Sequence, residues 1–264
     1  MTTLGLKTEL MFHRHNGVVE ERADYQLVRT PSNPTYFYGN LLVFKNAPQS
    51  GDLERWTKLY ENEFAKIEGI EHQTFLWGTG TPEPAELERF KATGFEYSET
   101  VVLVAEAITI QHPNTNFEFR RIETPEEWQQ VIELHVEVSR DEFRPELYRS
   151  FAKKRYDNYR RLQESGMGAW YGAFDGNLLV SDLGLYQEDG VARFQNIETH
   201  PFYRRQGICQ SLIRHAALDS GGRFFVMQAE EDGPAIAMYK RIGFEPREII
   251  AGLCLYDRSA WKTG

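Results

Sequence analysis

Residues 194–213 read FQNIETHPFYRRQGICQSLI, a segment that favours a strand, then a basic loop with one glycine, then a helix. A helix N-terminus presents unpaired backbone N–H groups and the positive end of the helix dipole, and both favour a phosphate or pyrophosphate. Arg204 and Arg205 add positive charge at the same place. The segment therefore predicts an anion-binding loop, a feature that many nucleotide-binding folds share.

The segments around this loop predict alternating strands and helices. Thr124, Pro125 and Glu127 form a helix start with a capping threonine, a proline at the first position and a glutamate at the capping-box position. Residues 175–177 favour a hairpin turn. The expected strands are 117–122, 168–174, 178–186, 191–199, 223–228 and 249–256, and the expected helices are 124 to about 138, 145 to about 164, and 206–218. A mixed α/β fold follows.

The first half of the chain contains a partial copy of this pattern. Residues 84–104 resemble residues 234–256, because each segment predicts a short helix closed by Gly-Phe-Glu and followed by a strand. Counting back from the two closing glycines aligns Phe90 with Tyr239. A helix followed by Gly-Phe is common, so these segments alone leave duplication and coincidence equally open.

The residues upstream strengthen the case for duplication. A strand over 36–45, a helix over 51–67 and a strand over 73–77 repeat the order of elements around the anion-binding loop. The loop itself differs, because residues 46–52 read NAPQSGD, with no cation and with Asp52 entering the helix. We therefore expect the first half to copy the fold without the phosphate site.

A polar run, QHPNTN at 111–116, separates the last expected strand of the first half from the first strand of the second. We expect two domains, a degenerate one over residues 1–112 and a complete one over residues 115–264.

Composition limits the functional classes. The chain has 264 residues, 41% of them hydrophobic and 13% aromatic, and contains no apolar run approaching the roughly 20 residues of a membrane helix. Residues 1–17 lack the apolar core of a secretion signal, and the two cysteines, Cys209 and Cys254, are too few for a disulfide framework. We expect a cytoplasmic protein. The formal net charge of −9 argues against nucleic acid or membrane partners.

Residues 117–256 resemble the GNAT (GCN5-related N-acetyltransferase) superfamily of acyl-CoA-dependent N-acyltransferases. The family's loop pattern is Arg or Gln, two variable residues, Gly, a variable residue, then Gly or Ala. Here Arg204 begins the pattern, Gly207 is the required glycine, and Cys209 stands where the family has Gly or Ala. The flanking matches are His200-Pro201, Leu212, Ala237 to Tyr239, and Gly243-Phe244.

The resemblance implies tandem GNAT-like folds, each with a mostly antiparallel central sheet flanked by helices. It also implies acetyl-CoA as co-substrate, no metal, and a primary amine on a small-molecule or peptide acceptor. Backbone groups of residues 196–199 would pair with the pantetheine arm, and the N–H groups of residues 205–210 would hold the pyrophosphate. The implied cofactor-binding residues are Ile197, Glu198, Thr199, Arg204, Arg205, Gln206, Gly207, Ile208, Cys209, Gln210, Asp232 and Tyr239.

Two catalytic residues are expected. By resemblance, Tyr239 donates a proton to the departing thiolate; the alternative is that its ring only packs beneath the helix. Glu198 is the candidate general base, expected to share a strand face with Asn196 and Phe194 because strand side chains alternate. The alternative for Glu198 is an ion-paired or solvated residue. Weaker candidates for the base are Asp182 and His135, and His200 is expected to be structural.

Three functional hypotheses remain from the sequence. The first is an N-acetyltransferase with residues 115–264 active, the second a non-catalytic acyl-CoA-binding regulatory module, and the third a scaffold. Arg204, Gly207 and Tyr239 together argue against the scaffold, but they do not separate the other two. The acceptor is expected to contact the loop at 139–144; a solvated loop between helices is the alternative there.

Overall fold

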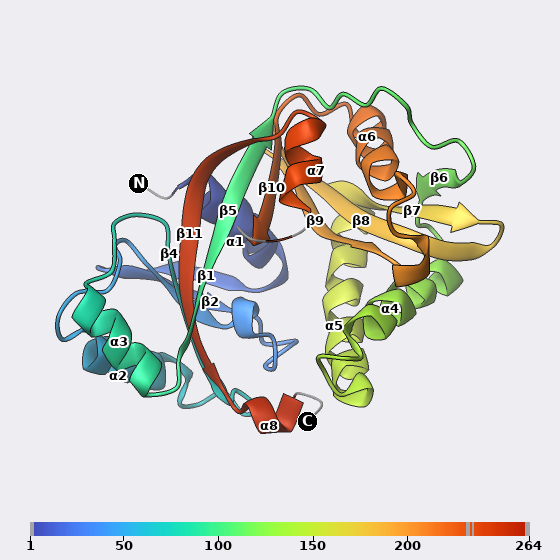
Figure 1. Cartoon of the computed structure of the whole chain (residues 1–264). Coiled ribbons are helices and arrows are strands. Elements are labelled where there is room, and N and C mark those ends of the chain that lie inside the picture. The colour runs from blue at the N-terminus through green and yellow to red at the C-terminus, as the bar shows by residue number, and fades with distance from the viewer. Residues whose placement is uncertain (1–2, 231–232, 234, 262–264) are drawn as a thin grey trace. The chain divides into compact units, whose positions relative to one another are not determined.

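The computed structural model describes residues 3–230, 233 and 235–261. The chain forms two compact units (Figure 1). Unit 1 extends to Val102 and takes in Glu248–Ala260, whereas unit 2 covers Leu103–Arg247 and Trp261. These bounds differ from the predicted domains 1–112 and 115–264, because the last strand of the chain pairs with a strand of the first part.

Unit 1 is a sheet with helices packed on it. Its strands lie in the order β1-β2-β3-β4-β11-β5. The β3–β4 pair is parallel, whereas β1–β2, β2–β3 and β4–β11 are antiparallel. The elements are α1 (Leu4–Asn16), β1 (Val18–Glu21), β2 (Tyr25–Arg29), η1 (Phe37–Gly39), β3 (Leu41–Phe44), α2 (Asp52–Phe64), β4 (His72–Trp77), α3 (Pro84–Ala92), β5 (Glu96–Ala105), β11 (Glu245–Tyr256) and α8 (Arg258–Trp261).

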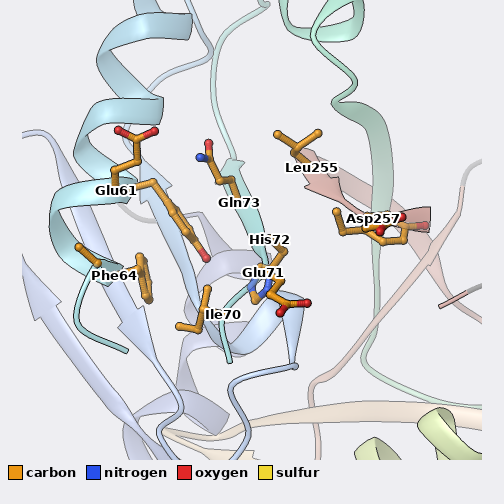
Figure 2. A pocket seen from close by; sticks show the side chains of 11 residues that line it. Glu61, Phe64, Ile70, Glu71, His72, Gln73, Leu255 and Asp257 are labelled. Atoms are coloured by element: carbon orange, nitrogen blue, oxygen red, sulfur yellow. The ribbon is translucent and has the colours of Figure 1, made fainter. Parts of the chain in front are cut away.

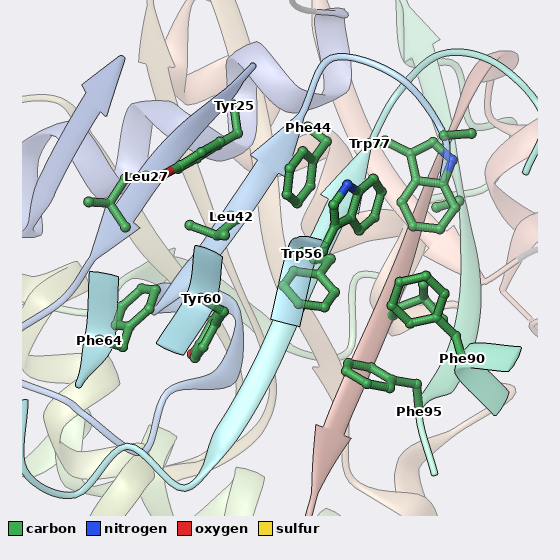
Figure 3. Close-up of a cluster of buried hydrophobic side chains, with 14 residues drawn as sticks. Tyr25, Leu27, Leu42, Phe44, Trp56, Tyr60, Phe64, Trp77, Phe90 and Phe95 are labelled. Carbon is green, nitrogen blue, oxygen red and sulfur yellow. The ribbon is translucent and has the colours of Figure 1, made fainter. Parts of the chain in front are cut away.

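The core of unit 1 is aromatic (Figure 3). Trp56, Tyr60 and Phe64 recur every four residues and so lie on one face of α2. The Trp56 ring stacks on Phe44 of β3 with ring centroids 3.8 Å apart, and Phe75 of β4 meets Trp56 edge-on. Aromatic side chains bury large areas, so these contacts fix α2 against the sheet.

Unit 2 has the sheet order β10-β9-β8-β7-β6, antiparallel from β6 to β9 and parallel between β9 and β10. Helices α4 and α5 pack on one face of this sheet and α6 on the other (Figure 1). The elements are β6 (Glu118–Arg121), α4 (Pro125–Ser139), α5 (Pro145–Glu164), β7 (Gly168–Asp175), β8 (Leu178–Glu188), β9 (Val191–Thr199), η2 (Pro201–Tyr203), α6 (Ile208–Ser220), β10 (Phe225–Glu230) and α7 (Ile236–Arg241).

The predicted mixed α/β fold is confirmed, including the capping box at the start of α4. There the Thr124 side chain accepts a hydrogen bond from the Glu127 N–H, and Glu127 accepts one from the Thr124 N–H. The predicted strand over 36–45 is shorter, because β3 begins only at Leu41. The chain before it folds around Asn40, whose side chain accepts from the Thr30 N–H and donates to the Asn33 carbonyl.

The chain contains a five-element repeat, β3-α2-β4-α3-β5 in its first part and β9-α6-β10-α7-β11 at its end, and the last strand of the second copy belongs to unit 1. The helices α3 and α7 close identically: the Phe95 N–H donates to the Phe90 carbonyl, and the Phe244 N–H to the Tyr239 carbonyl, both at 3.1 Å. Phe90 is therefore the structural counterpart of Tyr239.

Candidate functional site

The predicted anion-binding loop has the backbone geometry that anions need. Gly207, directly before α6, has φ +76°, and Arg205 is also left-handed at φ +65°. Across residues 205–210, no N–H group donates to a backbone oxygen of the described chain. A β-carbon on Gly207 would meet only the end of Gln210, so glycine is required there for its φ and not for space. Unpaired N–H groups in such a turn form an anion-binding concavity.

A residue outside the predicted site fastens this loop. The Asn114 side chain donates to the Gln206 carbonyl at 2.8 Å, and its backbone N–H donates to Ser211 Oγ. Ser211 in turn donates to the Gly207 carbonyl. Sequence analysis placed Asn114 in a linker, and only the polar character of that run hinted at hydrogen bonding.

Arg204 and Glu198 join the loop to the end of β9. The Arg204 guanidinium donates to the Thr199 carbonyl at 2.9 Å and to Glu198 Oε1 at 3.2 Å. Glu198 also accepts from the Thr199 N–H. The Arg204 side chain is therefore bound to the end of β9 and to Glu198. Arg205, in contrast, is exposed and forms no ion pair with a described residue.

A β-bulge interrupts the strand before the loop. Asp182 of β8 pairs with Glu198 and Gly184 pairs with Gln195, so Asn196 and Ile197 together oppose one residue of β8. Asn196 accordingly has φ +47°. Bulges release backbone groups from the ladder and re-aim side chains, and they are common beside active sites.

The bulge makes one prediction wrong. Glu198 does not share a face with Phe194, because the extra residue reverses the alternation between positions 194 and 198. Cross-strand partners point to the same face of a sheet, so Glu198 lies on the face of Asp182 and Gln195.

Tyr239, Cys209 and Glu198 lie within electrostatic range of one another. Burial, and then the charges of Cys209 and Glu198, raise the pKa of the Tyr239 hydroxyl. Tyr239 is 6% exposed, and its hydroxyl makes no hydrogen bond to a described residue. Burial and Glu198 likewise raise the pKa of the Cys209 thiol to about 12. At neutral pH Tyr239 thus holds its proton, and Cys209 is a neutral thiol of low reactivity.

The two weaker base candidates form a buried pair on the same face. His135 Nε2 of α4 lies 2.9 Å from Asp182 Oδ1. Burial raises the pKa of Asp182, against the opposing charge and hydrogen bond of His135. Asp182 Oδ2 has no hydrogen-bond partner among the described residues. His200 has the structural role expected of it, because its ring accepts from the Phe202 N–H and caps η2.

Helix α5 supplies polar side chains beside the bulge. Arg155 donates to Asn196 Oδ1 at 2.8 Å, and the Gln195 amide donates to the Tyr159 hydroxyl at 2.9 Å. Asn196 Nδ2 is enclosed and finds no acceptor in the described part of the chain. The released backbone and this orphaned amide are suited to a ligand that carries amide groups of its own.

Asp232 lies outside the described residues. Among those described, no cluster of three or more His, Cys, Asp or Glu side chains is arranged to hold a metal ion. None of the described helices combines the length and hydropathy that a bilayer crossing requires.

Comparison with known families identifies the region that holds this loop. Residues 167–246 match the family model described as an Acetyltransferase (GNAT) domain. No curated protein matches the chain.

Similar folds occur among solved structures. A functionally unknown conserved protein from Staphylococcus epidermidis is 14% identical, covers 89% of this chain and 92% of its own, and has a TM-score of 0.73. A GCN5-related N-acetyltransferase from Kribbella flavida is 14% identical over 98% of this chain and 94% of its own, with a TM-score of 0.65. A tandem GNAT protein from the clavulanic acid biosynthesis pathway is 14% identical, over 78% of this chain and 70% of its own, with a TM-score of 0.52. These similarities establish the fold.

Proposed function

We propose that this chain, whose residues 167–246 match the Acetyltransferase (GNAT) domain model, transfers an acetyl group from acetyl-CoA to a primary amine of a small molecule or peptide. That match supports acyl transfer. The proposal depends mainly on the observation that unit 2 contains three features together: the open N-terminus of α6, the bulge of β9, and the protonated Tyr239.

The acyl donor fits the residues on both sides of the bulge. The pyrophosphate would lie on the N–H groups of residues 205–210, with Arg205 as supplementary charge. The amide-bearing pantetheine arm would pair with the backbone freed at Asn196 and Ile197.

Acyl transfer needs two proton movements. The amine nitrogen attacks the thioester carbonyl, the C–S bond breaks, and the products are an amide and a free thiol. Tyr239 is protonated at neutral pH and would give its proton to the leaving thiolate. Glu198 would take the amine proton directly or through a water, and its cross-strand partner Asp182 lies on the same face.

One observation favours a second candidate function. The Glu198 carboxylate already accepts hydrogen bonds from Arg204 and from the Thr199 N–H, both at Oε1, so this oxygen is engaged in holding the loop. A non-catalytic acyl-CoA-binding regulatory protein, with Glu198 serving only to fix Arg204, would have the same contacts.

Two measurements on the full-length protein test both candidates. Acetyl-CoA should raise the unfolding temperature, because a ligand that binds the folded state stabilises it. A panel of primary amines should then release free CoA, detected with a thiol reagent. Absence of a thermal shift contradicts the acyl-CoA site itself. A shift without turnover on any amine favours the regulatory protein over the transferase.

A further inference from the structure

Unit 1 contains a cavity of about 580 Å³ (Figure 2). It lies at the C-terminal end of α2, the start of β4 and the end of β11. Helix α2 begins after Gly51, so this cavity is at the opposite end of the helix from the counterpart of the anion-binding loop. Ligand pockets typically measure about 300–1,000 Å³, and the cavity falls within that range.

The walls of the cavity are largely apolar. Phe64 of α2 and Leu255 of β11 stand on opposite sides of it, with Ile70 below (Figure 2). Tyr60 stacks on Phe64 with ring centroids 4.2 Å apart, and the Tyr256 side chain completes the lining on the β11 side. These surfaces suit an aryl or alkyl group of a ligand.

Two hydrogen-bond donors of the cavity lining, those of Tyr60 and His72, are directed into the protein. The Tyr60 hydroxyl donates to the Asn40 carbonyl at 2.9 Å. His72 Nε2 lies 3.2 Å from the same carbonyl, which can only accept, so this nitrogen carries the proton. Burial lowers the pKa of His72 to about 4, against two backbone carbonyls that raise it. His72 is therefore neutral at neutral pH and adds no positive charge.

The acceptors, in contrast, remain available. Gln73 Oε1 is enclosed and has no hydrogen-bond partner among the described residues. The carboxylates of Glu61 and Glu71 are exposed at the cavity, and neither forms an ion pair or hydrogen bond with a described residue. Asp257 also lines the cavity, but its carboxylate accepts from the Ser259 N–H at the start of α8 and is not counted among the available acceptors. No lysine or arginine occurs among the lining residues.

We propose that this cavity binds a protonated organic amine that carries an aryl or short alkyl group. The ammonium would pair with an exposed carboxylate of the cavity lining, Glu61 or Glu71, and the apolar group would rest on Phe64 and Leu255. The unpaired carboxylates of Glu61 and Glu71, with no lysine or arginine in the lining, give the cavity a negative potential that favours a cation over an anion or a neutral ligand. This site is in the unit without the anion-binding loop, so it is separate from the proposed transferase site.

The probe for a first test is phenethylamine, titrated calorimetrically into the full-length protein without acetyl-CoA. Its neutral counterpart, 2-phenylethanol, has a similar shape and lacks the charge. We expect the amine to bind at least tenfold more tightly than the alcohol. Equal affinities, or no binding of the amine, would overturn the proposal.

Matched variants locate the binding. Glu61→Gln combined with Glu71→Gln should weaken phenethylamine binding at least tenfold, and Leu255→Trp should fill the cavity and abolish it. Glu68→Gln removes an exposed carboxylate nearby that does not line the cavity, and it should bind as the parent does. Circular dichroism confirms that each variant is folded. Unchanged affinity in the double variant would place the amine elsewhere, including at the transferase site, and would refute the assignment.

Discussion

The N-termini of helices α2 and α6 occupy equivalent places in the repeat, but they differ in which groups accept hydrogen bonds from their backbone N–H groups. Both helices have 13 residues, connect the two strands of a parallel pair, and start after a left-handed glycine, Gly51 or Gly207. At α2 the Leu53 N–H donates to Glu86 Oε1 at 2.7 Å, and Asp52 accepts from the Gln49 N–H. At α6 the described residues supply no such carboxylate.

The difference shows how one fold can lose a ligand site without losing the helix. Glu86 is buried and provides the negative charge at α2 that a phosphate would provide at α6. Burial opposes ionisation of Glu86, but the N–H groups of Leu53 and Gly51 and the Arg89 guanidinium outweigh it and lower its pKa. Unit 1 thus carries a built-in anion, and it also has Phe90 where unit 2 has the hydroxyl of Tyr239.

The largest expected effect comes from removing that hydroxyl. Tyr239→Phe should lower kcat by about 10²- to 10⁴-fold, the usual contribution of a positioned proton donor, while the thermal shift with acetyl-CoA stays unchanged. Initial rates of CoA release measure the first and thermal unfolding the second. Tyr203→Phe, which removes another hydroxyl of unit 2, is the control and should change kcat less than twofold. Unaltered turnover in Tyr239→Phe would reject its role as acid.

The next effect tests the helix N-termini directly. Gly207→Trp forces a side chain into a left-handed position and onto the open N–H groups, so it should abolish stabilisation by acetyl-CoA. In the parent protein that stabilisation is about 2.7 kcal/mol at a ligand concentration 100 times Kd.

Gly51→Trp is the matched control, because Gly51 has φ +87° and nothing within 4 Å of an added β-carbon. It carries the same strain at the helix that has its own carboxylate, and the acetyl-CoA shift should survive. Loss of the shift in both variants would mean that general destabilisation, and not the loop, explains the result.

The Glu86 carboxylate at the start of α2 should affect the free energy of unfolding of unit 1 and not the binding of acetyl-CoA. Glu86→Gln removes the charge that accepts from Leu53 and pairs with Arg89, and should lower the free energy of unfolding of unit 1 by about 1–3 kcal/mol at pH 7. Because folding lowers the pKa of Glu86, its contribution is present above the unfolded-state pKa and is lost as pH falls through the folded-state value.

Urea unfolding at several pH values measures the difference in free energy of unfolding between the parent protein and Glu86→Gln. We expect this free-energy difference to become smaller as the pH falls. Glu88→Gln, on the exposed side of α3, should have no measurable effect at any pH. A difference that grows at low pH would contradict the proposed role of the ionised Glu86.

Local patterns predicted much of this structure. The capping box at Thr124 and the glycine before α6 depend on a few neighbouring residues, so the sequence alone indicates them. The bulge at Asn196 depends on pairing with β8, and the position of β11 beside β4 depends on which distant strand it meets. Neither feature leaves a local signal in the sequence. For this reason the predicted face of Glu198 was wrong, and the limits of the two units differ from the predicted domain limits.

The capping of α2 by Glu86 was also beyond local analysis. The loop at 46–52 predicted a missing phosphate site because it lacks a cation, but the carboxylate that takes the phosphate's place comes from α3, more than thirty residues later. The sequence predicted that the first half has no phosphate site. The packing of α3 against α2 explains how the N-terminus of α2 is stabilised without a phosphate, because it brings Glu86 to the Leu53 N–H.

The smallest expected effect concerns Asn114, which only tertiary structure connects with the loop. Asn114→Ala removes the side-chain hydrogen bonds to the Gln206 carbonyl and from the Asn116 N–H, and leaves the backbone bond to Ser211. A hydrogen bond of this kind contributes about 1 kcal/mol, so acetyl-CoA affinity should fall about fivefold with kcat unchanged. Calorimetric titration measures the affinity. Asn116→Ala is the control, because only its backbone N–H is bonded to Asn114. An equal loss in both variants would show that the loop depends on the whole polar run and not on Asn114.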